Sequence, residues 1–343
     1  MPYKSSVFYF ILFVGVNLAW SQTLSGTLKD RNTNAPIVGA SVYFDNTSYG
    51  TTTNFDGEFY FELKKHISAP LVISFVGYES IILYAIDFDK VYHLSLKQDV
   101  NALEEVVLDS KDEWSRPFKL QQFRREFLGH SKFGMGCAIL NEDAIVLNFD
   151  RKTKQLVASS KAPLVIKNIA LEYLVRYDLN HFSITYNIDT DSTLDLENAF
   201  KTVHSVGYYG TTFFENISSN NHRKALRNRK EAYIGSTLHF MRAVANNRLK
   251  EEKFKIFKGA YQIKPETQIT TFKNDSTKIV EVEIPLKLNI LCKGKQSAIQ
   301  SEVKRFQIDA FGNHAPVDKV LFGGFMGHQR IGDALPLDYG LAQ

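Results

Sequence analysis

Residues 36–59, PIVGASVYFDNTSYGTTTNFDGEF, decide the fold of the first part of the chain. Residues 39–44 form one run of β-branched, aromatic and small residues. Residues 58–63 form a second run, directly after the turn signal Asp56-Gly57. Short runs of this kind, separated by turn residues, are typical of antiparallel β-strands. The stretch therefore predicts two strands, the second entered from a tight turn.

The same pattern continues outward along the chain. Further strand-like runs occupy residues 71–76, 80–83 and 92–96, and no helical periodicity separates them. Strands at such close spacing predict a small β-sandwich. We assign it to residues 22–108.

Residues 22–108 resemble the carboxypeptidase-regulatory-like domain, an Ig-like (transthyretin-like) β-sandwich. The stretches that carry this resemblance are 26–30, 36–42, 50–59 and 73–79. Residues 103–108, LEEVVL, are similar to the segment that leads from this domain into the plug of TonB-dependent outer-membrane receptors. True zinc carboxypeptidases carry a separate catalytic domain with a His-x-x-Glu ligand pair, which this sequence lacks. The resemblance therefore implies a non-catalytic accessory module.

The first 21 residues have the three parts of a secretory signal. Lys4 precedes the apolar run 7–20, and Ala19-Trp20-Ser21 forms a cleavage site before Gln22. An uncleaved membrane anchor is the alternative, but the run is shorter than the roughly 20 apolar residues of a spanning helix. We expect residues 1–21 to be a signal peptide and the mature chain to lie in the periplasm or at the outer membrane, with no transmembrane span.

The rest of the chain predicts a linker at 109–116 and an α+β domain at 117–343 with a mostly antiparallel sheet. A helix is expected to enter at Pro117, with Leu120, Phe123 and Phe127 on one face and Gly129 as its stop. A second helix is predicted over 227–249. The predicted strands are 144–149, 155–158, 164–175, 182–186, 206–214, 278–292 and 303–308.

This second part resembles an uncharacterised companion domain that accompanies the sandwich in exported proteins of Gram-negative bacteria. The resemblance assigns no activity. It rests on five groups of residues, which are 123–131, 137–141, 163–168, 229–243 and 333–339.

A search for catalytic patterns finds none. The nine histidines include no His-Glu-x-x-His motif, and no histidine is followed three residues later by glutamate. Gly-x-Ser-x-Gly and the Gly-x-x-x-x-Gly-Lys-Ser/Thr phosphate loop are also missing from the sequence. We therefore predict no catalytic, metal-ligating or cofactor-binding residue. The alternative is a hydrolase of unrecognised type in the second domain, which would need an acid or nucleophile beside His239 in an open cleft.

The two cysteines, Cys137 and Cys292, each stand in an alternating strand pattern. Cys292 ends the apolar row of the predicted strand 278–292. An exported chain could join the two thiols in a disulfide. Two separate buried thiols are the equal alternative.

Residues 222–258 form the most unusual segment of the sequence. They contain 11 Lys and Arg against 3 acidic residues, whereas the whole chain has a formal net charge of +4. That small net charge does not indicate a nucleic-acid-binding protein. The basic segment predicts a surface for an anionic partner, which could be a cell-envelope protein, a lipid headgroup or a glycan. The alternative is a solvated helix face.

Six residues of this segment are predicted to form the candidate binding surface. Gly235 would weaken a helix interior and so suggests a close approach to the backbone, either by a partner or by another part of the same domain. The predicted residues are Arg229, Lys230, Gly235, His239, Arg242 and Asn246.

Overall fold

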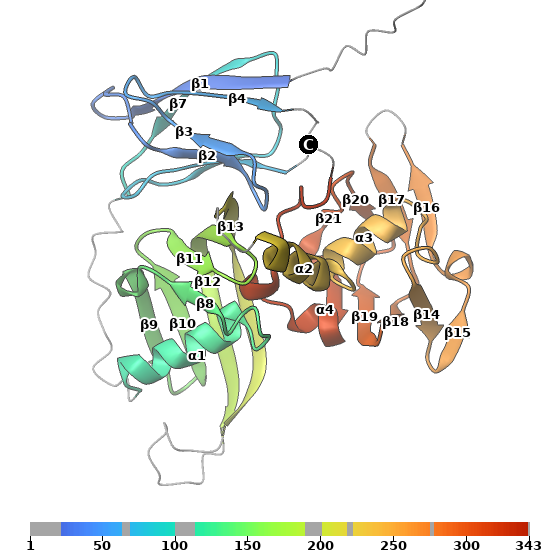
Figure 1. The fold of residues 1–343 in the computed structure, drawn as a ribbon. Coiled ribbons are helices and arrows are strands. Elements are labelled where there is room, and N and C mark those ends of the chain that lie inside the picture. The colour runs from blue at the N-terminus through green and yellow to red at the C-terminus, as the bar shows by residue number, and fades with distance from the viewer. Residues whose placement is uncertain are drawn as a thin grey trace, which may run out of the picture.

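A computed structural model describes residues 22–63, 69–99, 114–188, 201–217, 222–274 and 278–341. These residues form a β-sandwich, a middle unit and a third unit, each with its own hydrophobic core (Figure 1). The architecture is mainly β with few helices, so the predicted fold class is confirmed. The predicted signal peptide and residues 109–113 of the predicted linker lie outside the described residues.

The sandwich consists of two sheets, with strand orders β4-β1-β7 and β3-β2-β5-β6. Its five predicted strands are all present, and β1 adds a parallel pairing with β7. Gly57 shapes the predicted turn before β4, because its φ is +72° and a Cβ there would lie 2.5 Å from the Leu28 carbonyl oxygen. The strands are β1 (Gln22–Asp30), β2 (Ser41–Phe44), β3 (Gly50–Thr52), β4 (Glu58–Leu63), β5 (Leu71–Ser74), β6 (Ile81–Leu83) and β7 (Val91–Leu96).

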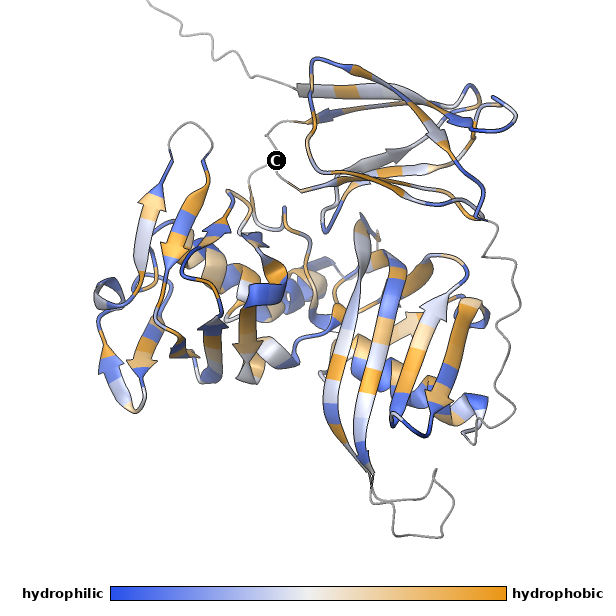
Figure 2. Cartoon of the chain, turned by 180° about the vertical axis from the view of Figure 1, so that it is seen from behind, coloured by the Kyte–Doolittle hydropathy of each residue, from blue (hydrophilic) through white to orange (hydrophobic). Residues whose placement is uncertain are grey.

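The middle unit is an antiparallel sheet with helix α1 on one face (Figure 1). Strands β11 and β10 pair with successive parts of the long strand β12, and β13 pairs along the other edge of β12. Figure 2 shows hydrophobic and hydrophilic residues alternating along these strands, as expected for a sheet with one buried face. The elements are α1 (Arg116–Leu128), β8 (Cys137–Ile139), a 3-10 turn (Glu142–Ala144), β9 (Ile145–Asp150), β10 (Gln155–Ser160), β11 (Leu164–Asn168), β12 (Tyr173–Ile188) and β13 (Lys201–Asn216).

The third unit contains two sheets, with orders β15-β14-β18-β19-β22 and β16-β17-β20-β21, packed with helix α3. Its helices are α2 (His222–Tyr233), α3 (Thr237–Ala245) and α4 (Gly324–His328), with 3-10 turns at Pro265–Thr267, Val317–Lys319 and Ile331–Asp333. Its strands are β14 (Phe254–Lys258), β15 (Tyr261–Ile263), β16 (Thr270–Lys273), β17 (Val280–Glu283), β18 (Lys287–Cys292), β19 (Lys295–Ser301), β20 (Phe306–Ile308), β21 (His314–Ala315) and β22 (Val320–Gly323).

Helix α1 matches its prediction closely. Its inward residues Phe123 and Phe127 are fully buried, and their rings pack edge-on against Phe182 of β12. Gly129 ends the helix as its C-cap residue with a φ of +101°. The predicted strands 144–149 and 155–158 are present as β9 and β10, which pair antiparallel.

Three predicted elements are wrong in their extent. The predicted helix 227–249 is two helices, α2 and α3, because Gly235 has a φ of +75° between them. The predicted strand 278–292 is interrupted at residues 284–286, where Leu286 is 71% exposed, and its halves belong to different sheets. The predicted strand 164–175 turns at residues 169–172, where Glu172 has a φ of +53°.

The range 117–343, treated in the sequence as one domain, holds two hydrophobic cores. Trp114 also belongs to the middle unit, although it falls within the predicted linker. Its indole is buried and stacks on Phe149, with the ring centroids 3.8 Å apart. Among the described residues, no helix is long and apolar enough to cross a membrane.

The aromatic core beneath α1 leads to a stability prediction. Replacing Phe123 by alanine should lower the free energy of unfolding by about 3–5 kcal/mol, because it leaves a cavity among buried rings. The matched change Phe55→Ala, at a side chain that is 86% exposed, should alter it by less than about 0.5 kcal/mol. Urea unfolding followed by Trp114 fluorescence measures both. Equal effects of the two changes would contradict the core assignment.

Candidate functional site

The six predicted surface residues lie around the junction of α2 and α3. Lys230 and Asn246 are exposed, but Arg229, Gly235, His239 and Arg242 are buried. The four buried residues therefore do not offer a surface to a partner. Each of them instead makes a specific contact that joins the helices to neighbouring elements.

Arg229 joins α2 to the middle sheet. Its Nε donates to the Leu171 carbonyl oxygen at 2.6 Å, and its Nη2 donates to the Glu172 carbonyl oxygen at 2.9 Å. The guanidinium also lies over the Tyr173 ring, with its carbon 3.9 Å from the centroid. These contacts satisfy the carbonyls of the turn between β11 and β12, so Arg229 has a structural role.

Gly235 allows the chain to turn between the two helices. Any other residue at this position would be strained by the positive φ, and its Cβ would lie only 3.0 Å from Cδ of Lys295. The Lys295 ammonium donates to the Ile234 and Glu231 carbonyl oxygens at 2.6 and 2.9 Å, where the end of α2 favours positive charge. The close approach predicted at Gly235 is therefore made by strand β19 of the same chain.

His239 is a buried histidine with both ring nitrogens engaged. Nδ1 accepts the Gly235 N–H at 3.0 Å, and Nε2 lies 3.2 Å from a carboxylate oxygen of Glu252. The ring packs between Tyr233 and Phe254, with centroids 4.7 Å away on each side. Burial lowers the pKa of His239, and the Glu252 carboxylate opposes this in part.

The hydrolase alternative required an open cleft beside His239. Glu252 supplies an acid at the required distance, but the His239 side chain is only 5% exposed. Its accepting nitrogen is already occupied by a backbone N–H. A general base must reach the proton that it removes, and this imidazole has no free position for it. The geometry around His239 therefore serves packing.

Arg242 binds three carbonyl oxygens from distant parts of the chain. Its Nε donates to Phe311 at 2.8 Å, its Nη1 to Tyr339 at 2.7 Å and its Nη2 to Leu337 at 2.5 Å. Asp309 adds a carboxylate near this guanidinium, and burial raises the pKa of that carboxyl group. Arg242 therefore fixes the segment 337–339 against helix α3.

Both cysteines are free thiols in the structure. Cys137 belongs to the middle sheet and Cys292 to a sheet of the third unit. Burial raises the pKa of Cys137 to about 12 and also raises the pKa of Cys292. Thiols in this state are poor nucleophiles. No group of three or more His, Cys, Asp or Glu side chains in the described residues could hold a metal ion.

Four exposed cations of the basic segment lie together on α2, and the prediction did not separate such exposed positions from the buried ones. Ala225, Arg229 and Ala232 are the buried residues of this helix, at spacings of four and three. This spacing places the three residues on one side of the helix, so the sequence itself indicates that the opposite side is exposed. It consists of Arg223, Lys224, Arg227 and Lys230, which we call the α2 basic face.

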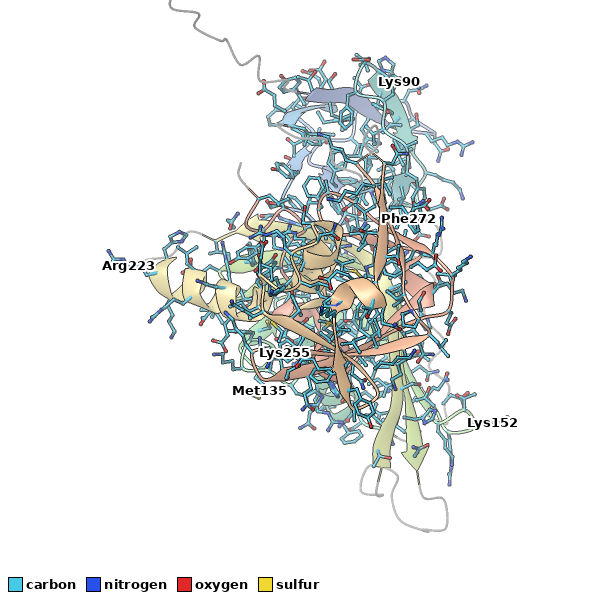
Figure 3. The ribbon with its side chains drawn as sticks, turned by 90° about the vertical axis from the view of Figure 1, so that its right-hand side faces the viewer. Lys90, Met135, Lys152, Arg223, Lys255 and Phe272 are labelled. Atoms are coloured by element: carbon cyan, nitrogen blue, oxygen red, sulfur yellow. The ribbon has the colours of Figure 1, made fainter. Side chains whose placement is uncertain are left out.

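The α2 basic face projects from the body of the molecule. Figure 3 shows Arg223 at the outer end of the helix, pointing away from the sheets. Among the described residues, none of its four side chains forms a salt bridge with a carboxylate. Two of its residues stand in the first turn, which contains no acidic residue, although a helix N-terminus favours negative charge. Arg223 and Lys224 therefore oppose the helix dipole, whereas Lys230 stands in the last turn, where positive charge is favourable.

Comparison with known proteins identifies similarity in the sandwich. Residues 24–108 match a family model described as the CarboxypepD_reg-like domain. An 86-residue stretch is 35% identical to the TonB-dependent receptor SusC of Bacteroides thetaiotaomicron. It covers 25% of this chain and only 8% of that receptor. The resemblance predicted for the first domain is confirmed, and the match to the family model ends at residue 108.

The three bonds of Arg242 predict a structural loss on substitution. Changing Arg242 to glutamine should lower the free energy of unfolding by about 3 kcal/mol, because buried carbonyls lose charged donors. Limited proteolysis should then cleave near residues 334–341 more readily than in the unaltered protein. Arg248→Gln is the control, because that side chain is 56% exposed. This change should lower the free energy of unfolding by less than about 1 kcal/mol. A stable Arg242→Gln protein with a protected C-terminal segment would refute this role.

His239 predicts a pH dependence of stability. Its folded-state pKa lies below the ordinary value of 6.5, so its stabilising contribution is complete above that pH and is lost as the pH falls. His314, whose pKa burial lowers to about 4, adds a second loss in the same direction. His239→Gln should be less stable than the unaltered protein at pH 8 but should lose less stability between pH 8 and 5. Urea midpoints measure this, with exposed His93→Gln as the control, and an unchanged pH dependence in His239→Gln would contradict it.

Proposed function

We propose that this protein is an exported, non-catalytic binding protein of the bacterial cell envelope. The β-sandwich serves as its accessory module, and the α2 basic face contacts an anionic partner. The observation that carries the proposal is the cluster of four exposed cations on one face of a helix whose other face is firmly anchored. The partner class is a cell-envelope protein, a lipid headgroup or a glycan, and not a nucleic acid.

The anchoring of α2 supports a binding role. Arg229 bonds the inner side of the helix to the turn before β12, and Lys295 bonds its C-terminal carbonyls. His222 at the first turn lies 3.5 Å from the buried carboxylate of Glu172. A partner would therefore meet cations on a backbone that is already ordered, so less conformational entropy is lost on binding.

The envelope location rests on two supports. The first 21 residues have the pattern of a secretory signal. The sandwich is similar to part of a TonB-dependent receptor, which makes an envelope setting the natural one for this module. We place the protein in the periplasm or at the outer membrane.

The α2 basic face predicts charge-dependent binding. Changing Arg223, Lys224, Arg227 and Lys230 together to glutamine should reduce recovery of the partner at least about tenfold, since each cation near an anionic surface contributes about 1 kcal/mol. The measurement is a crosslinking pull-down of the tagged mature protein from the native envelope at low and at high salt. Recovery by the unaltered protein should fall at high salt.

A matched control removes the same charge elsewhere in the same segment. Lys250, Lys253, Lys255 and Lys258 are also exposed, and they lie outside α2. Their joint change to glutamine should leave recovery close to that of the unaltered protein. An equal loss of partner recovery in the two variants would show that the net charge of the protein, and not the α2 basic face, determines binding. Salt-independent recovery, or no recovery at either salt, would overturn the proposal.

A further inference from the structure

Strand β13 is a long edge of the middle sheet. It pairs with β12 along residues 201–216, and β12 separates it from the other strands of that sheet. Figures 1 and 2 show β13 at the border of the sheet that faces the third unit, with α4 beside it. An unpaired edge exposes N–H and C=O groups that another extended chain can bind.

One end of this edge already holds an added segment. Thr47 of the sandwich forms a parallel bridge with Phe213, and the Phe214 N–H donates to the Thr47 carbonyl oxygen at 3.0 Å. The Asn46 N–H donates to the Thr212 carbonyl oxygen at 2.7 Å. Within the described chain, residues 205–210 have no backbone partner on that side. The free part of the edge thus continues directly from an existing strand contact.

A cleft of about 770 Å³ opens beside the first part of β13. Val203 and Val206 form an apolar strip on the strand. Helix α1 contributes Arg125 and His130 to one wall, and α4 contributes Phe325 and His328 to the other. The cleft therefore offers apolar and ionisable side chains next to an open backbone edge. We call this arrangement the β13 cleft.

The charges of the β13 cleft favour an acidic ligand. Arg125, Arg330 and three histidines, His130, His204 and His328, line it. Its two carboxylates are buried and engaged. Glu126 accepts from Arg125 at 3.0 Å and lies 3.3 Å from Nε2 of His130, and Asp333 accepts the Arg330 backbone N–H at 3.3 Å. The Arg330 guanidinium donates to the carbonyl oxygens of Glu126, Gly327 and Gln329. The exposed ionisable groups of the cleft are therefore Arg125 and the three histidines, and all of them are basic.

The bulge at His204 defines one end of the site. Ser205 pairs with Thr185 and Val203 pairs with Tyr186, so His204 is an extra residue without its own partner on β12. A bulge bends a strand and re-aims its side chain. Beyond this bulge, residues 205–209 pair with β12 without interruption, and a second irregularity of the ladder lies between Tyr209 and Gly210, next to the part of the edge that the sandwich covers.

We propose that the β13 cleft binds an extended acidic peptide segment of a partner protein by strand addition to residues 205–210. The peptide backbone would bond to the free edge, and its carboxylates would meet the basic groups of α1, β13 and α4. This site is separate from the α2 basic face, and either can exist without the other.

A labelled peptide tests the proposal on the full mature protein. The probe is a fluorescein-labelled peptide of about ten residues that alternates threonine and glutamate, long enough to span the edge at about 3.3 Å per residue. Fluorescence anisotropy should show binding that is at least about tenfold tighter than for a threonine-lysine peptide. A proline-glutamate peptide of equal charge should bind poorly, because proline lacks the N–H donors of a strand.

Hydrogen exchange locates the binding site. The amides of residues 205–210 should exchange more slowly when the threonine-glutamate peptide is bound. The double change His204→Glu and His328→Glu should weaken binding at least about tenfold. His93→Glu, on an exposed strand of the sandwich, should leave it unchanged, and so should the quadruple glutamine variant of the α2 basic face.

Three results would overturn the proposal. Equal binding of the threonine-glutamate and proline-glutamate peptides would show that the backbone edge takes no part. Loss of binding in the α2 variant would move the peptide to that helix. A dimer that forms through β13 without peptide, detected by light scattering and protection of residues 205–210, would assign the edge to a second copy of the chain.

Discussion

The connection between the third unit and the sandwich depends on the bonds that Arg242 makes to the segment 337–339. This guanidinium holds the Leu337 and Tyr339 carbonyls against the third unit. The same segment then reaches the sandwich, where the Leu337 N–H donates to the Asn46 carbonyl oxygen at 2.7 Å and Asp338 accepts from Ser48 at 2.7 Å. Leu337 also packs on the sandwich core. A single buried cation thus connects α3 to the sandwich through one turn of the chain at residues 337–340.

The sequence predicted the local elements of the fold better than their connections. Strand periodicity and turn residues located the sandwich strands, and the spacing of Phe123 and Phe127 located α1, because these signals act over a few residues. The break at Gly235 was missed, since a glycine within an apolar helical pattern fits either a weakened helix or a turn with positive φ. The two cores of the range 117–343 were also beyond prediction, because the partners in each core lie far apart in the chain.

The candidate site shows why a count of basic residues in a segment does not identify a binding surface. Arg229 and Arg242 belong to the basic segment by composition, yet the structure uses both as donors to buried carbonyls. Arginine suits this task because its planar group offers several donors and keeps its charge. Helical periodicity separates such inward arginines from outward ones, whereas the three carbonyl partners of Arg242 depend on long-range folding. The β13 cleft likewise combines α1, β13 and α4, which no local pattern relates.

The bond between Ser48 and Asp338 joins residues that are 290 positions apart in the sequence. Contacts of such separation form slowly, because a long loop must close before they contribute any stability. The strands of the sandwich, in contrast, pair within a short stretch of chain. Folding should therefore proceed module by module, with the docking of the sandwich as a late event. During that interval the whole edge of β13, including the part that Thr47 later covers, is accessible to other chains.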